Sequence, residues 1–301
     1  MQNKSLVTII CLCYNHEKFI MESLFSVIYQ DYPFIELIIV DDCSTDNSKD
    51  IINEWLLDYP KAQFIINKTN LGNTKSFNKA LKLAKGEYII DLAADDVLVS
   101  NCISLQIKTF RESSFKNLGI VYGNAELITE KSEFDSYYFP TDDTGKIIKK
   151  KHTGDIYLYI LSDGKSICSV SAMTKKSVYD SLKGYDETLA YEDLDFWIRS
   201  ARLYEFDFID DVLIKKRISD NSLTTNFYDS RKSRFKKMNL STYLILKKAI
   251  RLNRNKKEDL AIQKRVHHEI VHTFKFKDYK SFYKNIGLRF WLFLRTNFKK
   301  Y

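Results

Sequence analysis

Two adjacent aspartates, Asp95 and Asp96, follow an apolar run at residues 88–94. An apolar run of this length is typical of a buried strand, so both carboxylates are expected where that strand ends at a cleft. Side by side they repel each other and resist burial unless a cation or a polar ligand compensates. A divalent metal carrying a phosphate fits, because Mg²⁺ is held by one or two carboxylates plus phosphate oxygens. An isolated Asp-Asp pair more often forms an ordinary acidic loop, so the rest of the chain decides.

The first 95 residues alternate between strand-like and helix-like segments. Apolar runs predict strands at 7–13, 35–40, 64–66 and 88–94, and helical periodicity predicts a helix after each of the first three. This alternation indicates a mainly parallel sheet with right-handed crossovers. No glycine-rich GxGxxG or Walker segment follows the first strand, which counts against a dinucleotide or P-loop enzyme.

Polar side chains follow three of these predicted strands. Asn15 follows the first strand, Asp41 and Asp42 follow the second, and Asp95 and Asp96 follow the fourth. Ligands of open α/β sheets bind beyond the carboxyl ends of the strands. We therefore expect these side chains to converge on one edge of the sheet.

A further acidic cluster precedes a predicted helix later in the chain. Glu192, Asp193 and Asp195 fall in its first turn, and Leu194 and Trp197 belong to its apolar face. Acidic residues in a first turn satisfy free backbone N–H groups and interact favourably with the helix dipole. That structural role explains one or two of the three carboxylates and leaves a chemical role open for the rest.

Several short motifs occur in a definite order along the chain. They are residues 7–15, Gln-Asp-Tyr-Pro at 30–33, Val-Asp-Asp-Cys-Ser-Thr-Asp-Asn-Ser at 40–48, Asn-Leu-Gly at 70–72 with Asn78, Lys-Gly-Glu-Tyr-Ile at 85–89, Ala-Asp-Asp at 94–96, Gly-Tyr-Asp-Glu at 184–187, Glu-Asp at 192–193 and Arg-Ile-Ser-Asp-Asn-Ser at 217–222. Over about residues 5–225 this ordered set resembles the family 2 glycosyltransferases, inverting enzymes that use nucleotide-sugar donors. Each motif is weak by itself, and the order makes the resemblance specific.

The resemblance implies an α/β protein with the GT-A fold, a mainly parallel, Rossmann-like sheet flanked by helices. It implies that Asp96 binds a divalent metal, Mg²⁺ or Mn²⁺, and that Asp95 contacts the donor ribose or the water shell of the metal. The donor is expected to be a nucleotide-diphosphate sugar, UDP-linked. The other residues implied in donor binding are Thr8, Asn15, Asp41, Asp42 and Arg217, the last as a contact to the diphosphate.

Inverting sugar transfer needs a base that takes the proton of the acceptor hydroxyl. By resemblance Asp193 is expected to be this base, with Glu192 as a supporting or alternative residue. Asp195 and Arg199 are expected to orient the helix, and Asp186 to fix a turn. The implied enzyme is a hexosyl- or N-acetylhexosaminyl-transferase. It would act on a glycan or lipid-linked acceptor in surface polysaccharide or glycolipid biosynthesis.

Four positions depart from the pattern of the family. Leu12 replaces a usual proline, Cys43 a glycine, Phe77 a frequent arginine and Ser219 a common histidine. With Phe77 a phosphate contact is either lost or moved to Lys75. The alternative function is therefore a catalytically inactive nucleotide-sugar-binding protein or a structural subunit of a polysaccharide-assembly complex.

The net charge of +8 is unevenly distributed. Residues 231–301 carry a balance of +17, and residues 1–230 a balance of −9. We expect a GT-A glycosyltransferase domain at 1–230 and a basic helical C-terminal extension at 231–301. Basic helices with aromatic residues suit an anionic membrane surface, although a solvated extension that packs on the catalytic domain or a partner subunit is the alternative. No nucleic-acid-binding motif accompanies the charge, so nucleic acid is not an expected partner.

The start of the chain shows no secretory signal pattern, and no stretch approaches the roughly 20 apolar residues of a membrane-spanning helix. The five cysteines are odd in number, show no zinc spacing and suit core thiols in a reducing compartment. We expect a cytoplasmic protein, located at the inner face of the cell membrane if the extension binds lipid.

Overall fold

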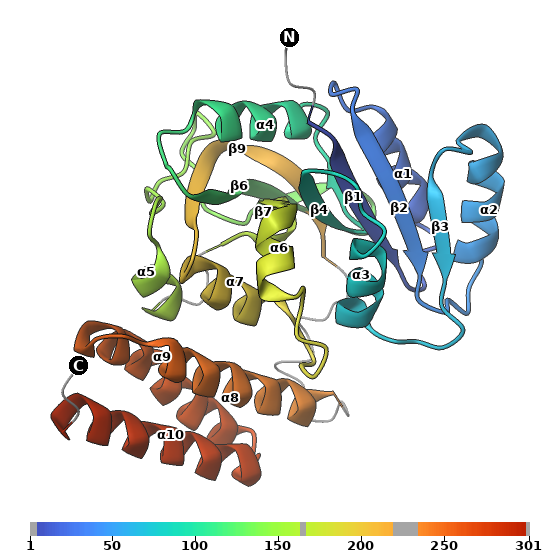
Figure 1. Ribbon diagram of the computed structural model, residues 1–301. Helices are drawn as coiled ribbons and strands as arrows, with labels where there is room; N and C mark the ends of the chain where they lie inside the picture. The colour runs from blue at the N-terminus through green and yellow to red at the C-terminus, as the bar shows by residue number, and fades with distance from the viewer. Residues whose placement is uncertain (1–4, 163–166, 219–233, 299–301) are drawn as a thin grey trace. The chain divides into compact units, whose positions relative to one another are not determined.

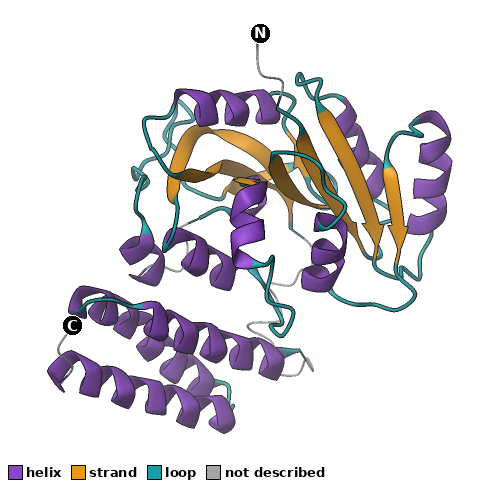
Figure 2. Ribbon diagram, in the orientation of Figure 1, coloured by secondary structure: helices purple, strands orange, loops and turns teal. Residues whose placement is uncertain are grey.

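The computed structural model describes residues 5–162, 167–218 and 234–298 (Figure 1). Ser219, one of the departures noted above, lies outside these residues. The described chain forms two compact units. Unit 1 contains the described strands and the helices that flank them, whereas the described elements of unit 2 are all helices (Figure 2).

The described strands of unit 1 form one nine-stranded sheet. They are β1 (Val7–Cys13), β2 (Ile35–Asp41), β3 (Gln63–Ile66), β4 (Tyr88–Ala93), β5 (Val97–Leu98), β6 (Leu118–Ile128), β7 (Phe134–Tyr137), β8 (Met173–Lys175) and β9 (Glu205–Arg217). Their order is β3-β2-β1-β4-β8-β6-β9-β5, with β7 paired to β6. The α/β fold predicted from the sequence is confirmed by this arrangement.

The first half of the sheet is parallel, as the alternation of strands and helices predicted. β1 pairs in parallel with β2 and β4, and β2 with β3. Beyond β4 the sheet is mixed, because β8 runs antiparallel to β4 and β6 while β6 and β9 are parallel. Cys13 pairs with Asp41, and Leu12 with Ala93, so β1, β2 and β4 end at the same edge.

Helices flank the sheet of unit 1 (Figure 1). They are α1 (Ile20–Ile28), α2 (Ser48–Asp58), α3 (Asn73–Leu81), α4 (Cys102–Glu112) and α6 (Lys176–Leu182). Phe77 on α3 is fully buried, with its ring centroid 5.2 Å from that of Tyr179 and 4.4 Å from that of Tyr185. The phenylalanine at this position is therefore a core residue, whereas Lys75 on the same helix is exposed.

Unit 2 contains two helices from the middle of the chain and the three C-terminal helices. They are α5 (Tyr157–Ser162), α7 (Asp193–Ala201), α8 (Phe235–Leu252), α9 (Lys256–Lys275) and α10 (Tyr279–Phe298). The helical C-terminal region is thus confirmed. The grouping differs from the division expected at residue 230, because α5 and α7 pack with the C-terminal helices. None of the described helices is both long and apolar enough to cross a membrane.

Candidate active site

Asp41 and Asp42 at the end of β2 have different surroundings, although both are expected from the resemblance to bind the donor. Asp42 is saturated by protein donors: its carboxylate accepts hydrogen bonds from Asn67 Nδ2 at 2.9 Å and from the backbone N–H groups of Leu71 at 2.8 Å and Gly72 at 2.7 Å. Asp41 Oδ2 accepts from the backbone N–H of Ser44, but its buried Oδ1 has no partner in the protein. Since buried polar atoms are normally paired, Asp41 is the better candidate for ligand contact.

Asn15 and its neighbours form a strained turn beside Asp41. Asn15 has φ 59° and Cys43 has φ 65°, values that favour glycine. Asn15 Oδ1 accepts a hydrogen bond from the backbone N–H of Thr45 at 2.8 Å, and the Asn15 N–H donates to Ser44 Oγ at 2.9 Å. Asn15 therefore lies at the expected edge and joins the ends of β1 and β2. The positive φ of Cys43 also explains why glycine suits this position.

Asp95 and Asp96 lie beyond the end of β4, at the same edge. The Asp96 side chain is buried, and its Oδ1 accepts the backbone N–H of Arg217 at 2.9 Å. Burial, reinforced by the charge of Asp95, raises the pKa of the Asp96 carboxyl. His16 Nε2 lies 3.8 Å from Asp95 Oδ2, and the buried His16 Nδ1 has no partner. Unpaired polar atoms therefore occur beyond the end of β1, at His16, as well as at the end of β2, at Asp41.

Arg217, expected to contact the donor diphosphate, is buried at the end of β9 with no exposed side-chain surface. Its guanidinium donates to Glu22 at 2.6 Å, to the backbone carbonyl oxygens of Asp95 and Thr129 at 3.0 and 2.9 Å, and to Ser132 Oγ at 3.0 Å. The proposed diphosphate contact does not fit this geometry, because the donors are occupied by protein groups. Arg217 instead positions the segment that carries the two aspartates.

Thr8 is not brought to this edge, contrary to its expected place in the donor pocket. It is the second residue of β1, five residues before the end at Cys13, a distance of about 16 Å along a strand. Its Oγ1 donates to Glu36 Oε2 at 2.6 Å and accepts the Gly86 N–H at 2.9 Å. Thr8 thus links the starts of neighbouring strands, at the opposite end from the candidate site.

The acidic residues at this edge suit a divalent cation in chemistry. Carboxylate oxygens are hard ligands, and a cation would relieve the repulsion between Asp95 and the buried Asp96. The described residues contain no group of three or more His, Cys, Asp or Glu side chains placed to hold a metal. A cation here would therefore take further oxygen ligands from a phosphate and water, as Mg²⁺ commonly does.

Asp91, inside the apolar run of β4, was missed by the sequence analysis. The Tyr185 hydroxyl donates to Asp91 Oδ2 at 3.0 Å. Asn78 fixes Tyr185 through two hydrogen bonds of 2.9 Å to its backbone N–H and carbonyl. Burial raises the pKa of Asp91 to about 7. The sequence did contain a sign of this buried carboxyl, because Asp91 is the one charged residue within the apolar run at 88–94.

The predicted catalytic carboxylates belong to unit 2. Glu192 occupies the N-cap position of α7 and makes no side-chain capping hydrogen bond, whereas Asp193 Oδ1 accepts the N–H of Leu194 at 2.6 Å. Asp195 is buried, and the Arg199 Nε donates to its Oδ2 at 2.7 Å. The helix-orienting pair expected from the sequence is therefore present, and the side chain of Glu192 is not used as a cap.

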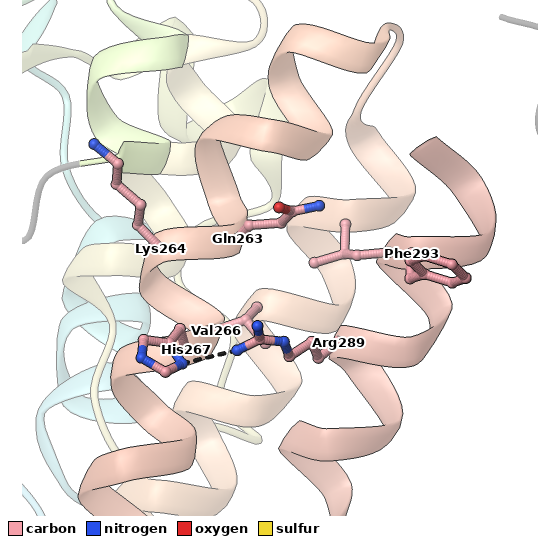
Figure 3. A pocket seen from close by; sticks show the side chains of 7 residues that line it. Gln263, Lys264, Val266, His267, Arg289 and Phe293 are labelled. Carbon is pink, nitrogen blue, oxygen red and sulfur yellow. Dashed lines mark hydrogen bonds between the residues drawn. The ribbon is translucent and has the colours of Figure 1, made fainter. Parts of the chain in front are cut away.

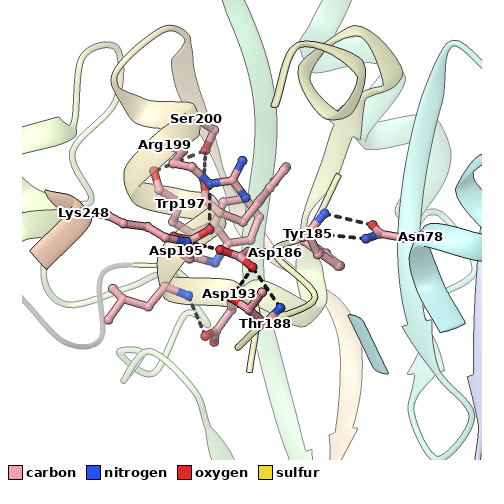
Figure 4. Close-up of polar contacts among 12 residues, drawn as sticks. Asn78, Tyr185, Asp186, Thr188, Asp193, Asp195, Trp197, Arg199, Ser200 and Lys248 are labelled. Atoms are coloured by element: carbon pink, nitrogen blue, oxygen red, sulfur yellow. Dashed lines mark hydrogen bonds and ion pairs between the residues drawn. The ribbon is translucent and has the colours of Figure 1, made fainter. Parts of the chain in front are cut away.

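Lys248 on α8 joins two of the acidic residues of this region (Figure 4). Its Nζ contacts an oxygen of Asp186 and lies 3.0 Å from Asp195 Oδ1. Asp186 Oδ1 also accepts the Thr188 N–H at 2.9 Å, which forms the expected turn. Partial burial opposes ionisation of Asp186, but hydrogen bonds from Lys248 and Thr188 outweigh it and lower its pKa to about 2.

Helix α8 also anchors the loop that leads into α7. Ser241 Oγ accepts the N–H of Ala190, and the hydroxyl groups of Tyr191 and Thr242 lie within hydrogen-bonding distance, both at 2.8 Å. In the sequence, Lys248 is only one of many basic residues within 231–301. Because its partners lie 53 and 62 positions away in sequence, no local pattern indicated this role.

Comparisons with known proteins agree with this architecture. Residues 8–173 match the family model described as Glycosyl transferase family 2. An uncharacterized glycosyltransferase of Methanocaldococcus jannaschii is 30% identical over 250 residues, which cover 81% of this chain and 79% of that protein. The chain therefore belongs to glycosyl transferase family 2.

Two solved structures share the fold. S. aureus TarS 1–349, solved in complex with UDP-GlcNAc, is similar with a TM-score of 0.63 and 19% identity, covering 90% of this chain and 73% of that one. Mannosyltransferase PcManGT from Pyrobaculum calidifontis, in complex with GDP-Man and Mn²⁺, gives a TM-score of 0.59 at 13% identity, covering 100% of this chain and 89% of that one. The protein is thus a glycosyltransferase with the GT-A fold.

Proposed function

We propose that the protein is a metal-dependent, inverting glycosyltransferase that uses a nucleotide-diphosphate sugar, UDP-linked, as donor. One observation carries this proposal. The unpaired, buried Oδ1 of Asp41, the last residue of β2, and the Asp95-Asp96 pair beyond β4 lie at the ends of two strands that both pair in parallel with β1. Ligands of such sheets bind beyond these strand ends.

The residues at this edge have different proposed roles in donor binding. Asp41 Oδ1 is available to accept a hydrogen bond from the nucleoside, while Asn15 and Asp42 hold the surrounding loops. Asp96, with Asp95, would hold a divalent cation, which supplies positive charge to the leaving diphosphate when bound. Arg217 keeps both aspartates in place through its backbone N–H and its guanidinium.

Asp193 is the proposed base, and Glu192 supports or replaces it. As the acceptor oxygen forms its bond to the anomeric carbon, Asp193 takes the hydroxyl proton and the bond from that carbon to the diphosphate breaks. Attack opposite the leaving group inverts the configuration. Both carboxylates start α7, whose orientation depends on the contact between Asp195 and Lys248.

We assign the transferred group to the hexosyl or N-acetylhexosaminyl class. The acceptor would be a glycan or a lipid-linked sugar in surface polysaccharide or glycolipid biosynthesis. The UDP-GlcNAc in TarS and the GDP-Man and Mn²⁺ in PcManGT support a nucleotide-sugar donor and a divalent metal. The basic helices within 231–301 would hold the protein at an anionic membrane surface, on the cytoplasmic side.

A panel of UDP- and GDP-sugars, read by metal-dependent donor hydrolysis and then by transfer, tests this proposal. We expect Asp193→Asn to lower transfer by about 100-fold or more while donor affinity stays the same. Asp155→Asn, which changes an exposed carboxyl of the same unit, is the matched control and should behave as wild type. Donor binding without turnover in the wild-type protein would instead favour the inactive sugar-nucleotide-binding alternative.

A further inference from the structure

The outward face of α10 is more apolar than its buried face. Polar residues Ser281, Asn285 and Thr296 are among those turned inward. Tyr283 is 69% exposed and Phe290 is 62% exposed. We give the name aromatic stripe to six exposed apolar or aromatic residues of this face, which are Tyr279, Tyr283, Ile286, Phe290, Phe293 and Leu294. Exposed apolar side chains that line one face of a helix in this way mark a candidate interaction surface.

The acidic side chains of the described C-terminal helices are turned away from solvent. Glu258 and Asp259 form ion pairs of 2.8 Å with arginines of unit 2, and the buried Asp278 accepts a hydrogen bond from Asn239. Glu269 is half-buried. Exposed cations of α9, α10 and the turn between these helices include Lys264, Lys275, Lys277, Lys280 and Arg289. The solvent side of these helices therefore combines aromatic residues with positive charge.

An open pocket of about 350 Å³ lies between α9 and α10, and Phe293 of the stripe forms part of its wall (Figure 3). Lys264, His267 and Arg289 also line it, and none of its lining residues is acidic. Arg289 Nη1 lies 2.8 Å from His267 Nδ1, so both side chains point to one place. Cationic donors beside an aromatic wall suit a phosphate that carries an apolar chain.

We propose that α10 binds the surface of a bilayer containing anionic phospholipid, with the aromatic stripe at the headgroup level and a lipid phosphate in the pocket of Lys264, His267 and Arg289. Helices of this kind lie in the plane of the interface, with aromatic residues immersed and cations near the headgroups. The inference deepens the membrane association included in the proposed function by naming the face, and it does not depend on the chemistry of sugar transfer.

A second copy of the chain is the other occupant that an apolar stripe could accept. In a symmetric dimer the same patch would face itself, which would bring the exposed cations of both copies together. That repulsion disfavours a dimer, whereas an anionic bilayer relieves it. The positive charge around the stripe therefore favours an anionic lipid surface over a second copy of the chain.

Flotation of the full-length protein with vesicles tests the proposal. Vesicles of phosphatidylcholine alone are compared with vesicles containing about 30% phosphatidylglycerol. We expect wild type to bind only the anionic vesicles. Phe290→Ser with Phe293→Ser, and separately Lys264→Gln with Arg289→Gln, should each weaken partitioning by about tenfold or more. Matched controls in unit 1, Leu57→Ser and Lys61→Gln, also change exposed side chains and should bind as wild type.

Equal binding to neutral and anionic vesicles, or unchanged binding of both double variants, would overturn the proposal. Light scattering provides the other decisive result: if the stripe variant dissociates an oligomer and vesicle binding is unchanged, the stripe is a dimer contact. If the phenylalanine variant loses its thermal unfolding transition, it is not folded and its vesicle binding is not interpreted. The vesicle binding of the Lys264→Gln, Arg289→Gln variant then tests the proposal. Donor hydrolysis by wild type without vesicles is measured in parallel, so a failure of the transfer function is distinguishable from a failure to bind lipid.

Discussion

Two groups of carboxylates in this protein differ in what balances their charge. In unit 1, Asp96 is buried next to Asp95, and burial together with the charge of Asp95 raises the pKa of its carboxyl. In unit 2, Asp186 and Asp195 share the ammonium group of Lys248, and the pKa of Asp186 falls to about 2. The negative charge of Asp95 and Asp96 could therefore be compensated by a bound cation. The negative charge of Asp186 and Asp195 is compensated by Lys248 within the chain.

This difference separates a binding role from a positioning role. A carboxylate that is paired with a lysine fixes local geometry, while a carboxylate held by backbone donors keeps affinity for an external cation. Both groups consist of aspartates in loops or first turns, so residue type alone does not distinguish them. We therefore expect substitutions of Asp95 or Asp96 to lower activity by weakening metal binding. Substitutions around Lys248 should lower activity by changing the orientation of α7.

The largest expected effect is that of Asp96→Asn. It removes the charge proposed to hold the metal, and we expect kcat to fall by about 100-fold or more. Excess Mn²⁺ should restore part of the activity, because weaker binding can be overcome by concentration. The measurement is donor hydrolysis and transfer against metal concentration, with the exposed Asp211→Asn as control. Wild-type activity that survives a chelator would contradict the metal assignment.

Lys248→Met tests the positioning role. Without the ammonium group Asp195 keeps Arg199 but loses its link to α8, so the orientation of α7 and of Asp193 should relax. We expect kcat to fall by about 10-fold to 100-fold with little change in the donor KM. Lys248→Arg should recover part of the loss, and Lys247→Met on the same helix serves as control. A rise in donor KM at constant kcat would assign Lys248 to binding instead.

Asp41 and Asp42 offer a comparison within one edge. Asp41→Asn changes the carboxylate with the unpaired oxygen, so donor affinity should fall by about 10-fold with little loss of stability. Asp42→Asn disturbs three hydrogen bonds that hold the loop at 67–72, so its main effect should be on stability. Calorimetric titration with the nucleotide and thermal unfolding separate the two outcomes. Equal effects of both variants on affinity would mean that the donor contacts both.

The position of the donor edge could be predicted from the sequence, because it depends on local patterns. Alternating apolar runs and helices set the parallel pairing of β1, β2 and β4, and this pairing aligns their ends. Thr8 was assigned wrongly from the resemblance, although its place at the start of β1 already put it at the other end of the sheet. The direction of the predicted strand would therefore have placed Thr8 away from the donor site.

The roles of Arg217 and Lys248 could not be predicted, because they depend on distant contacts. Arg217 meets Asp96 across 121 positions, and its burial follows from partners on several elements. Lys248 lies in a basic segment where charge alone suggests a solvated or lipid-facing side chain. Only the packing of α8 against α7 shows that this lysine pairs with buried Asp195.

The smallest expected effect is on the pH dependence of stability. The pKa of Asp186 is about 2 in the folded protein and near 3.9 when unfolded, so the unfolded state binds the proton more readily. Its contribution is therefore complete above about pH 5 and is lost as the pH falls toward 2. Because Asp186 is partly exposed, we expect Lys248→Met to lower the free energy of unfolding by about 1 kcal/mol at pH 7. Urea unfolding at pH 7 and at about pH 3 measures this effect. A difference between variant and wild type that does not shrink at the lower pH would show that Lys248 stabilises the protein through its packing or its contact with Asp195, and not through the charge of Asp186.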